Sequence, residues 1–248
     1  MLVLVAACGG DGSPPKPTTA QFVFELAEGA ADGDRRVIEN VLTDVRAYFA
    51  AEMGSDIQRD VRVTIKPEDP LTGKTAYGGF SYMQFYTGAP GWTSWRNRRA
   101  ESANASLIAH EYFHSLQWDL MAGEGEPKWQ ATSPPAWLVE GSADLASFRF
   151  AEHARYQKMQ YAIDYYSELI AGKPQPRLGT VIVNSEANYA QAFLAVELLG
   201  RGHELRVFAT FFTDAGTMDW RAAFAKNFGE SVDAFIDRYE AGPSARTP

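Results

Sequence analysis

The sequence predicts an α+β fold in which a mixed β-sheet comes first and a mostly helical part follows. Two short segments near the start, 21–26 and 61–65, alternate apolar and polar residues as strands do. Between them, segment 37–49 carries apolar residues at helical spacing. From Glu101 onward helical spacing dominates, and strands followed by helices are typical of the α+β class.

The first part is expected to open with a strand–helix–strand unit and to continue with one more strand. Asp32 or Asp34 can cap the first helix, and Gly54 can end it. Residues 80–87, FSYMQFYT, are rich in aromatic residues and lie between glycine-rich segments, which favours a further strand that could lie at a sheet edge.

The second part is expected to be built from helices that glycine and proline residues separate. Helical apolar spacing covers the following segments: 102–121, 137–171, 187–201, 204–213, 219–228 and 231–241. We expect one domain over 20–242, with a sheet lobe at 20–121 and a helical lobe at 122–242. It follows a signal remnant at 1–8 and a flexible tether at 9–19.

Composition excludes some classes of function. Lys plus Arg number 23 against 31 for Asp plus Glu, so the net charge is -8, whereas a nucleic-acid partner needs a basic surface. No apolar run approaches the roughly 20 residues of a membrane-spanning helix. We therefore expect no nucleic-acid partner, and we expect a monomer.

The only cysteine, Cys8, excludes an intrachain disulfide and lies in an informative setting. The segment LVAAC at 4–8 resembles a bacterial lipobox, in which the cysteine becomes the lipid-modified N-terminus. That resemblance implies a lipid-anchored protein of the bacterial cell envelope, with the outer membrane slightly favoured because Gly9 follows the cysteine. The alternative is an ordinary apolar N-terminus.

One motif indicates metal chemistry. His110-Glu111-Tyr112-Phe113-His114 is an H-E-x-x-H sequence inside a predicted helix, where positions four residues apart share one face. Both imidazoles can therefore reach one cation, and two rigidly placed nitrogens suit zinc. Taken alone, the motif could also be a pair of surface or core histidines on an amphipathic helix.

A second segment resembles a known family. Trp137-Leu138-Val139-Glu140-Gly141-Ser142-Ala143 is similar to the W-L-x-E-G-x-A segment of gluzincin metallopeptidases, and the later segments 188–193 and 228–235 are similar to the peptidase-MA-like members. The resemblance covers roughly 100–240. It implies a zincin-like fold with His110, His114 and Glu140 as zinc ligands and Glu111 as general base.

Two more residues receive roles from the same resemblance. Asp144 follows Glu140 by one helical turn and is expected to orient His110 through its second ring nitrogen. Tyr189 is the candidate donor to the oxyanion, with Tyr161, Tyr165 and Tyr166 in reserve, although Tyr189 could equally be a core aromatic residue.

The implied activity is hydrolysis of protein or peptide substrates. Segment 80–87 could pair with an extended substrate, and Tyr82, Tyr86, Trp92 and Trp95 could line its pockets or belong to the core. Aminopeptidases of the resembled clan bind the free amine of a substrate with a glutamate in a G-x-M-E-N-like segment, and its absence here favours an endopeptidase. A long loop at 121–136 is expected beside the cleft. The alternatives are a non-catalytic envelope-tethered binding lipoprotein and a zinc hydrolase of a non-peptide amide.

Overall fold

The computed structural model describes residues 20–68, 75–89, 92, 101–123, 125 and 133–242. Its strands are β1 (Phe22–Leu26), β2 (Val61–Lys66), β3 (Ala76–Gly79) and β4 (Tyr82–Tyr86). Its helices are α1 (Asp32–Met53), α3 (Glu101–Ala122), α4 (Ala136–His153), α5 (Met159–Ile170), α6 (Glu186–Leu199), α7 (Arg206–Ala215), α8 (Trp220–Phe228) and α9 (Val232–Glu240). A short 3-10 helix spans Leu178–Thr180.

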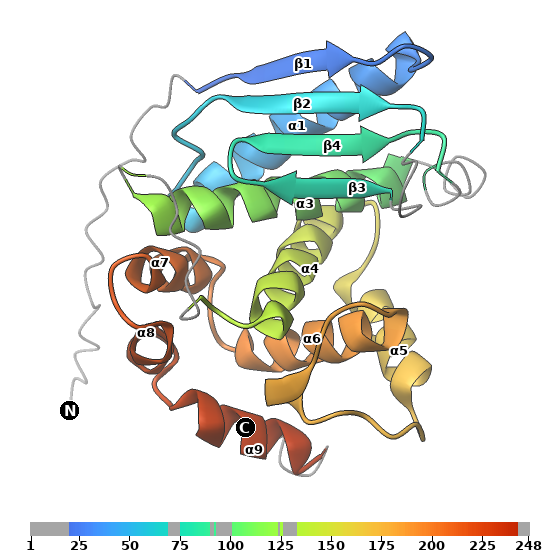
Figure 1. Ribbon diagram of the computed structural model, residues 1–248. Helices are drawn as coiled ribbons and strands as arrows, with labels where there is room; N and C mark the ends of the chain where they lie inside the picture. Colours follow the sequence, from blue (N-terminus) through green and yellow to red (C-terminus); the bar gives the residue numbers. More distant parts are fainter. Residues whose placement is uncertain are drawn as a thin grey trace, which may run out of the picture.

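The described residues form a mixed sheet followed by helices, so the predicted α+β class is confirmed. The sheet has the order β1-β2-β4-β3, in which β1, β2 and β4 are parallel and β3 is antiparallel to β4. Helix α3 packs along β3 and against α1, and α4 leads from α3 to the other helices (Figure 1). No helix in the described part of the chain is long and apolar enough to cross a bilayer.

The expectation that segment 80–87 could lie at the sheet edge is wrong. Its strand, β4, lies between β2 and β3, and β3 forms the edge next to α3. Half of β3 is Gly78-Gly79, and glycine is depleted in strands because it has no side chain to pack. The edge strand therefore carried no strand signal in the sequence.

Helix ends differ from expectation at two places. Asp32 and Asp34 lie inside the first turn of α1, where their negative charges interact favourably with the helix dipole, and Ala31 is the N-cap. The single helical stretch expected at 137–171 is divided into α4 and α5. Arg155 takes a φ of 62° at the break, and no glycine or proline marks it.

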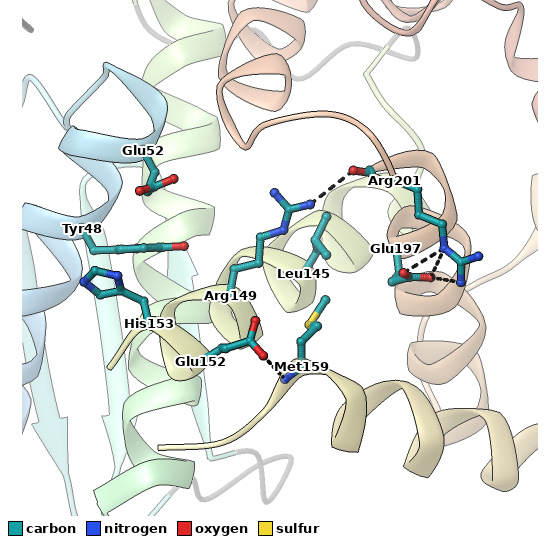
Figure 2. A pocket seen from close by; sticks show the side chains of 10 residues that line it. Tyr48, Glu52, Leu145, Arg149, Glu152, His153, Met159, Glu197 and Arg201 are labelled. Atoms are coloured by element: carbon teal, nitrogen blue, oxygen red, sulfur yellow. Dashed lines mark hydrogen bonds and ion pairs between the residues drawn. The ribbon is translucent and has the colours of Figure 1, made fainter. Parts of the chain in front are cut away.

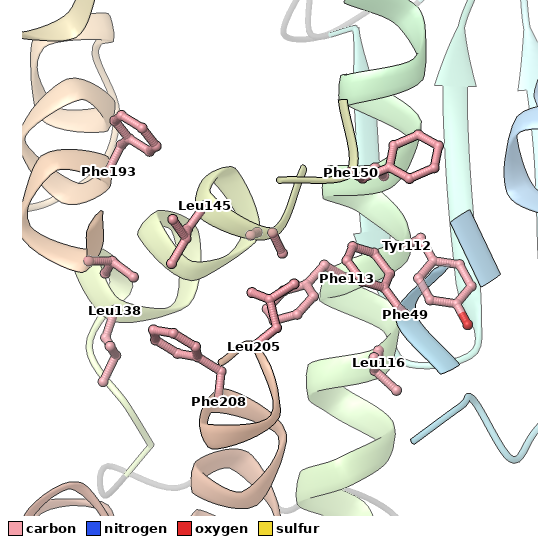
Figure 3. Packing of buried hydrophobic residues seen from close by; sticks show 14 of the residues in the cluster. Phe49, Tyr112, Phe113, Leu116, Leu138, Leu145, Phe150, Phe193, Leu205 and Phe208 are labelled. Atoms are coloured by element: carbon pink, nitrogen blue, oxygen red, sulfur yellow. The ribbon is translucent and has the colours of Figure 1, made fainter. Parts of the chain in front are cut away.

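The core joins the sheet and the helices through aromatic side chains. The ring centroid of Phe49 of α1 lies 5.6 Å from the ring centroids of both Tyr112 and Phe113 of α3. Figure 3 shows Tyr112 on one side of α3, with Leu138 of α4 and Phe208 of α7 on the other. Tyr112 and Phe113 are the two variable residues of the H-E-x-x-H motif, so this packing fixes the motif's position.

We expect Gly141→Ala to destabilise the protein by about 1–3 kcal/mol, as overpacking does. A Cβ at this position of α4 would lie 2.4 Å from the Ala192 carbonyl oxygen and 2.7 Å from Val196 Cγ2 of α6. Thermal or urea unfolding measures the change. The control is Gly33→Ala in the first turn of α1, where a Cβ meets nothing within 4 Å. Equal stability of the two variants would contradict the close packing of α4 on α6.

Candidate metal centre

Two helices bring the predicted ligands together. His110 and His114 come from α3, where their spacing of four residues places them on one face, and Glu140 comes from α4. The two Nε2 atoms lie 2.9 Å apart, and Glu140 Oε2 lies 3.3 Å from His110 Nε2 and 3.2 Å from His114 Nε2. They form the one group of potential metal ligands found among the described residues.

The geometry of these three atoms fits zinc. Ligand atoms held at roughly 2.0–2.1 Å from a tetrahedral zinc ion lie roughly 3.3 Å from each other, close to the separations found here. Two imidazole nitrogens and one carboxylate oxygen are also a donor set that zinc accepts in catalytic sites. The residues present can therefore hold a zinc ion.

Hydrogen bonds to Nδ1 hold both imidazole rings in place. His110 Nδ1 lies 2.8 Å from Asp144 Oδ1, and His114 Nδ1 lies 2.8 Å from Gln117 Oε1. The Gln117 amide nitrogen donates to the Val139 carbonyl and the Ser142 hydroxyl of α4, both at 2.9 Å. Such partners set the tautomer of each ring and leave Nε2 free for the metal.

The contact of Asp144 was expected from the sequence, but the role of Gln117 was missed. Gln117 lies three residues after His114 on the same helix, and that spacing was its only signal. Its bonds to α4 depend on how the two helices pack, which the sequence pattern does not contain.

We expect Asp144→Asn to weaken zinc binding or activity by about 10–100-fold, as changes behind a metal ligand do. The amide nitrogen of asparagine can face the ring nitrogen that now faces a carboxylate oxygen. Zinc affinity can be measured by competition with a chromophoric chelator. The control is Asp164→Asn on the exposed face of α5, which should bind zinc as the wild type does. Equal affinities in the two variants would contradict the role of Asp144.

Charges at the centre depend on one another. Burial opposes a charge on His110, but the Asp144 carboxylate raises the histidine's pKa well above its usual value. Burial acts to raise the pKa of Glu140, yet the hydrogen bonds from His110 and His114 hold it well below the usual range. Glu140 is therefore a carboxylate in this protein, which is the form that binds a metal.

Glu111 is buried beside the two histidines and faces β3. Burial raises the pKa of its carboxyl above the usual value, although His110 and His114 act in the opposite direction. The backbone N–H of Gly78 donates to this carboxylate. A Cβ at Gly78 would lie 2.4 Å from the Glu111 carbonyl oxygen, so only glycine allows β3 to approach α3 this closely.

Tyr189 lies in the first half of α6, half-buried, close to the same carboxylates. Burial raises the pKa of its phenol, and the neighbouring charges of Glu140, Asp144 and Glu111 raise it further. The phenol therefore keeps its proton at neutral pH. The influence of these three carboxylates places Tyr189 near the candidate metal centre.

The three reserve tyrosines lie on α5 and differ from Tyr189. Tyr161 is 64% exposed, and the Tyr165 hydroxyl donates to Glu186 at the start of α6. Tyr166 packs against Phe148 and Phe193, and burial followed by the charge of Asp144 raises its pKa. Glu111 is not among the charges that act on the pKa of Tyr165 or Tyr166.

Other sequence-based expectations find no place at the metal centre. Trp92 is fully buried against Phe85, and Tyr86 is buried with its hydroxyl bonded to Gln84, so both belong to the core. Tyr82 is half-exposed. Trp95, Cys8 and half of the loop at 121–136 lie outside the described residues.

Comparisons with known proteins give matches by structure. No protein-family model matches the chain, and no curated protein sequence matches it. A mutant M1 zinc metallopeptidase from Deinococcus radiodurans matches with a TM-score of 0.54 at 17% identity, over 94% of this chain and 52% of that one. An M1 zinc metallopeptidase from the same organism matches with a TM-score of 0.52 at 17% identity, over 94% of this chain and 50% of that one.

A third solved structure is a mutant M1 zinc metallopeptidase from Deinococcus radiodurans bound to a Tyr-Ser-Ala substrate, with a TM-score of 0.51 at 15% identity over 88% of this chain and 47% of that one. This chain thus spans about half the length of the solved structures it matches. The likeness shows that the chain has the fold of part of these zinc metallopeptidases, which agrees with a zincin-like α+β architecture.

Proposed function

We propose that this chain is a zinc-dependent peptidase of the gluzincin type. The observation that carries the proposal is the convergence of three ligand atoms, from His110, His114 and Glu140, beside the buried carboxyl of Glu111. Three protein ligands leave one zinc position for water, which is typical of catalytic sites. The fold likeness to zinc metallopeptidases supports the same function.

In the proposed reaction each polar group of the centre has a defined role. When bound, zinc supplies Lewis-acid chemistry, which lowers the pKa of water and polarises the carbonyl of the scissile bond. Glu111 takes a proton from the attacking water and passes it to the leaving amine. The Gly78 N–H keeps the Glu111 carboxylate in position, and Tyr189 donates a hydrogen bond to the developing oxyanion.

We assign alignment of an extended substrate to β3 instead of segment 80–87. β3 is the edge strand that packs on α3, and main-chain pairing at a sheet edge orients a peptide with little demand on its sequence. The residues of β3, AYGG, include no carboxylate that could bind a free amine. The proposed substrate is therefore an internal peptide bond of a protein or peptide.

A peptide-library experiment tests the proposed activity. Wild-type protein is incubated with proteome-derived peptides, first as purified with one equivalent of zinc, then after chelation, then after zinc is restored. We expect internal cleavage that disappears on chelation and returns with zinc. Zinc binding without cleavage of any peptide would favour the non-catalytic binding protein. Cleavage confined to non-peptide amides would favour the alternative hydrolase.

We also propose a location in the bacterial cell envelope, supported by the lipobox-like segment before Cys8. Acyl chains on that cysteine would contribute roughly 0.8 kcal/mol for each CH₂ buried in a membrane. The tether at 9–19 would let the catalytic domain reach substrates near that surface. Outer-membrane placement and a monomeric state remain parts of this proposal.

Replacement of Cys8 tests the anchor. Expressed in a bacterial host behind a complete signal, the wild type is expected to incorporate labelled fatty acid and to fractionate with membranes. Cys8→Ser should do neither, because serine cannot receive the thioether-linked lipid. Equal labelling of the two proteins would overturn the lipoprotein assignment and leave the metal centre untouched.

A further inference from the structure

A second cleft lies on a different face of α4 from the metal ligands. It has a volume of about 360 Å³ and is lined by α1, α4, α6 and the first residue of α5. Arg149, which lines it, follows Glu140 by nine residues, or roughly two and a half helical turns. An adjoining hollow of about 510 Å³ shares Tyr48, Glu52 and His153 with it, so the two form one groove.

Tyr48 is the central polar group of this groove. Tyr48 is only 9% exposed, yet its hydroxyl points into the cleft (Figure 2). Its ring packs between Phe150 and His153, at 5.6 Å and 4.8 Å between centroids. Among the described residues, none forms a hydrogen bond with that hydroxyl. Burial and then the charge of Glu52 raise the pKa of the phenol, which therefore stays neutral.

Acidic side chains flank Tyr48 along α1. Asp44 precedes it by four residues and Glu52 follows it by four, so the three form a stripe on one helix face. Neither carboxylate has an ion pair within the described part of the chain. Glu152 of α4 adds a third carboxylate from the opposite wall, where it accepts a hydrogen bond from the Met159 N–H.

The basic side chains of the groove are already engaged. Arg149 donates to the carbonyl oxygens of Gly200 and His203, at 3.2 Å and 3.4 Å, in the turn that follows α6. Arg201 forms an ion pair with Glu197 at 2.9 Å. The lining carries four carboxylates against two guanidinium groups, so the net charge of the groove is negative and a cation complements it.

The adjoining hollow supplies an apolar wall beside these acids. Ala47 and Ala51 form its α1 side, and Phe150 of α4 and Tyr156, in the turn after α4, form the other side. An aliphatic stem can lie against these side chains, and the faces of aromatic rings attract cations. The groove thus presents an apolar slot that ends at carboxylates and a phenol oxygen.

From these contacts we infer that the groove binds a primary alkylammonium group, with its aliphatic stem in the apolar hollow and its ammonium between Glu52, Glu152 and the Tyr48 hydroxyl. The ammonium group would donate hydrogen bonds to the carboxylates and to the phenol oxygen. A lysine side chain of a polypeptide and a free diamine share this chemistry. The site is separate from the metal centre and does not rest on the proposed peptidase activity.

A nuclear magnetic resonance titration of the zinc-loaded protein tests this inference. The probes are Nα-acetyl-lysine methylamide for the polypeptide source and 1,5-diaminopentane for the free diamine, with 1-pentanol as a neutral ligand of similar shape. We expect at least one ammonium probe to shift resonances of groove residues with a Kd on the order of 1 mM, as suits so small a ligand. Pentanol should bind at least about tenfold more weakly because it lacks charge-assisted hydrogen bonds.

Matched variants locate the binding site. Glu52→Gln and Tyr48→Phe should each weaken binding of the ammonium probe, by about tenfold for the lost carboxylate and less for the lost hydroxyl. Glu39→Gln, on the same helix but outside the groove, should bind as the wild type does. Absence of binding by both ammonium probes, equal binding of pentanol, or an unchanged Kd in Glu52→Gln would each overturn the inference.

Discussion

His110→Ala, His114→Ala and Glu140→Ala are each expected to reduce zinc affinity by more than the roughly 10–100-fold loss that a change behind a ligand produces. Each substitution removes one of the three atoms that converge at the candidate metal centre. Two remaining protein ligands hold zinc poorly, since stable sites with this metal use three or four. The measurement is zinc content after dialysis against a weak chelator, together with the Kd from competition.

The matched control is His203→Ala. His203 lies after α6, packs its ring against Phe228 and does not belong to the ligand group. It should keep one zinc per chain, which separates loss of a ligand from loss of any histidine. Full zinc occupancy in Glu140→Ala would contradict the gluzincin assignment, because that family is defined by the glutamate ligand.

Glu111→Gln is expected to keep zinc and the fold while losing at least about 100-fold in peptide hydrolysis. The amide has nearly the shape of the carboxyl but cannot accept the water proton. Because Glu111 does not supply a ligand atom, the zinc content should be unchanged. The measurement is kcat/KM on one peptide from the library, alongside zinc analysis of the same preparation.

Glu168→Gln on the exposed part of α5 serves as the control for this variant and should be fully active. If Glu111→Gln turned over peptides at the wild-type rate, another group would have to be the general base. Loss of zinc in Glu111→Gln would instead mean that the carboxyl holds the site together, and the loss of activity would then say nothing about proton transfer.

The centre was predictable because its signals are local. His110 and His114 face the same way on any helix, and Asp144 follows Glu140 by one turn of a second helix. The strands 21–26 and 61–65 were equally visible, because each has one buried face that alternates with an exposed one.

The features that were missed depend on contacts between distant segments. Strand β3 pairs with β4 and lies against α3, where Gly78 approaches Glu111, and its own sequence has little strand propensity. The break between α4 and α5 at Arg155 has no glycine or proline to mark it. Tyr48 was counted only as one apolar position of a helix, and its hydroxyl matters only because α4 and α6 form a groove around it.

Gln117 has a consequence for how this protein would acquire its metal. One side chain touches His114 and two groups of α4, and none of these bonds needs an ion. We therefore expect the two helices to stay at ligand spacing in the apoprotein, unlike a zinc finger, which folds only around its metal. Zinc could be removed and returned without refolding, so the concentration of free zinc in the surroundings would set the fraction of competent molecules. Zinc binding would raise the Tm of the protein by mass action, because the ion binds only the folded state.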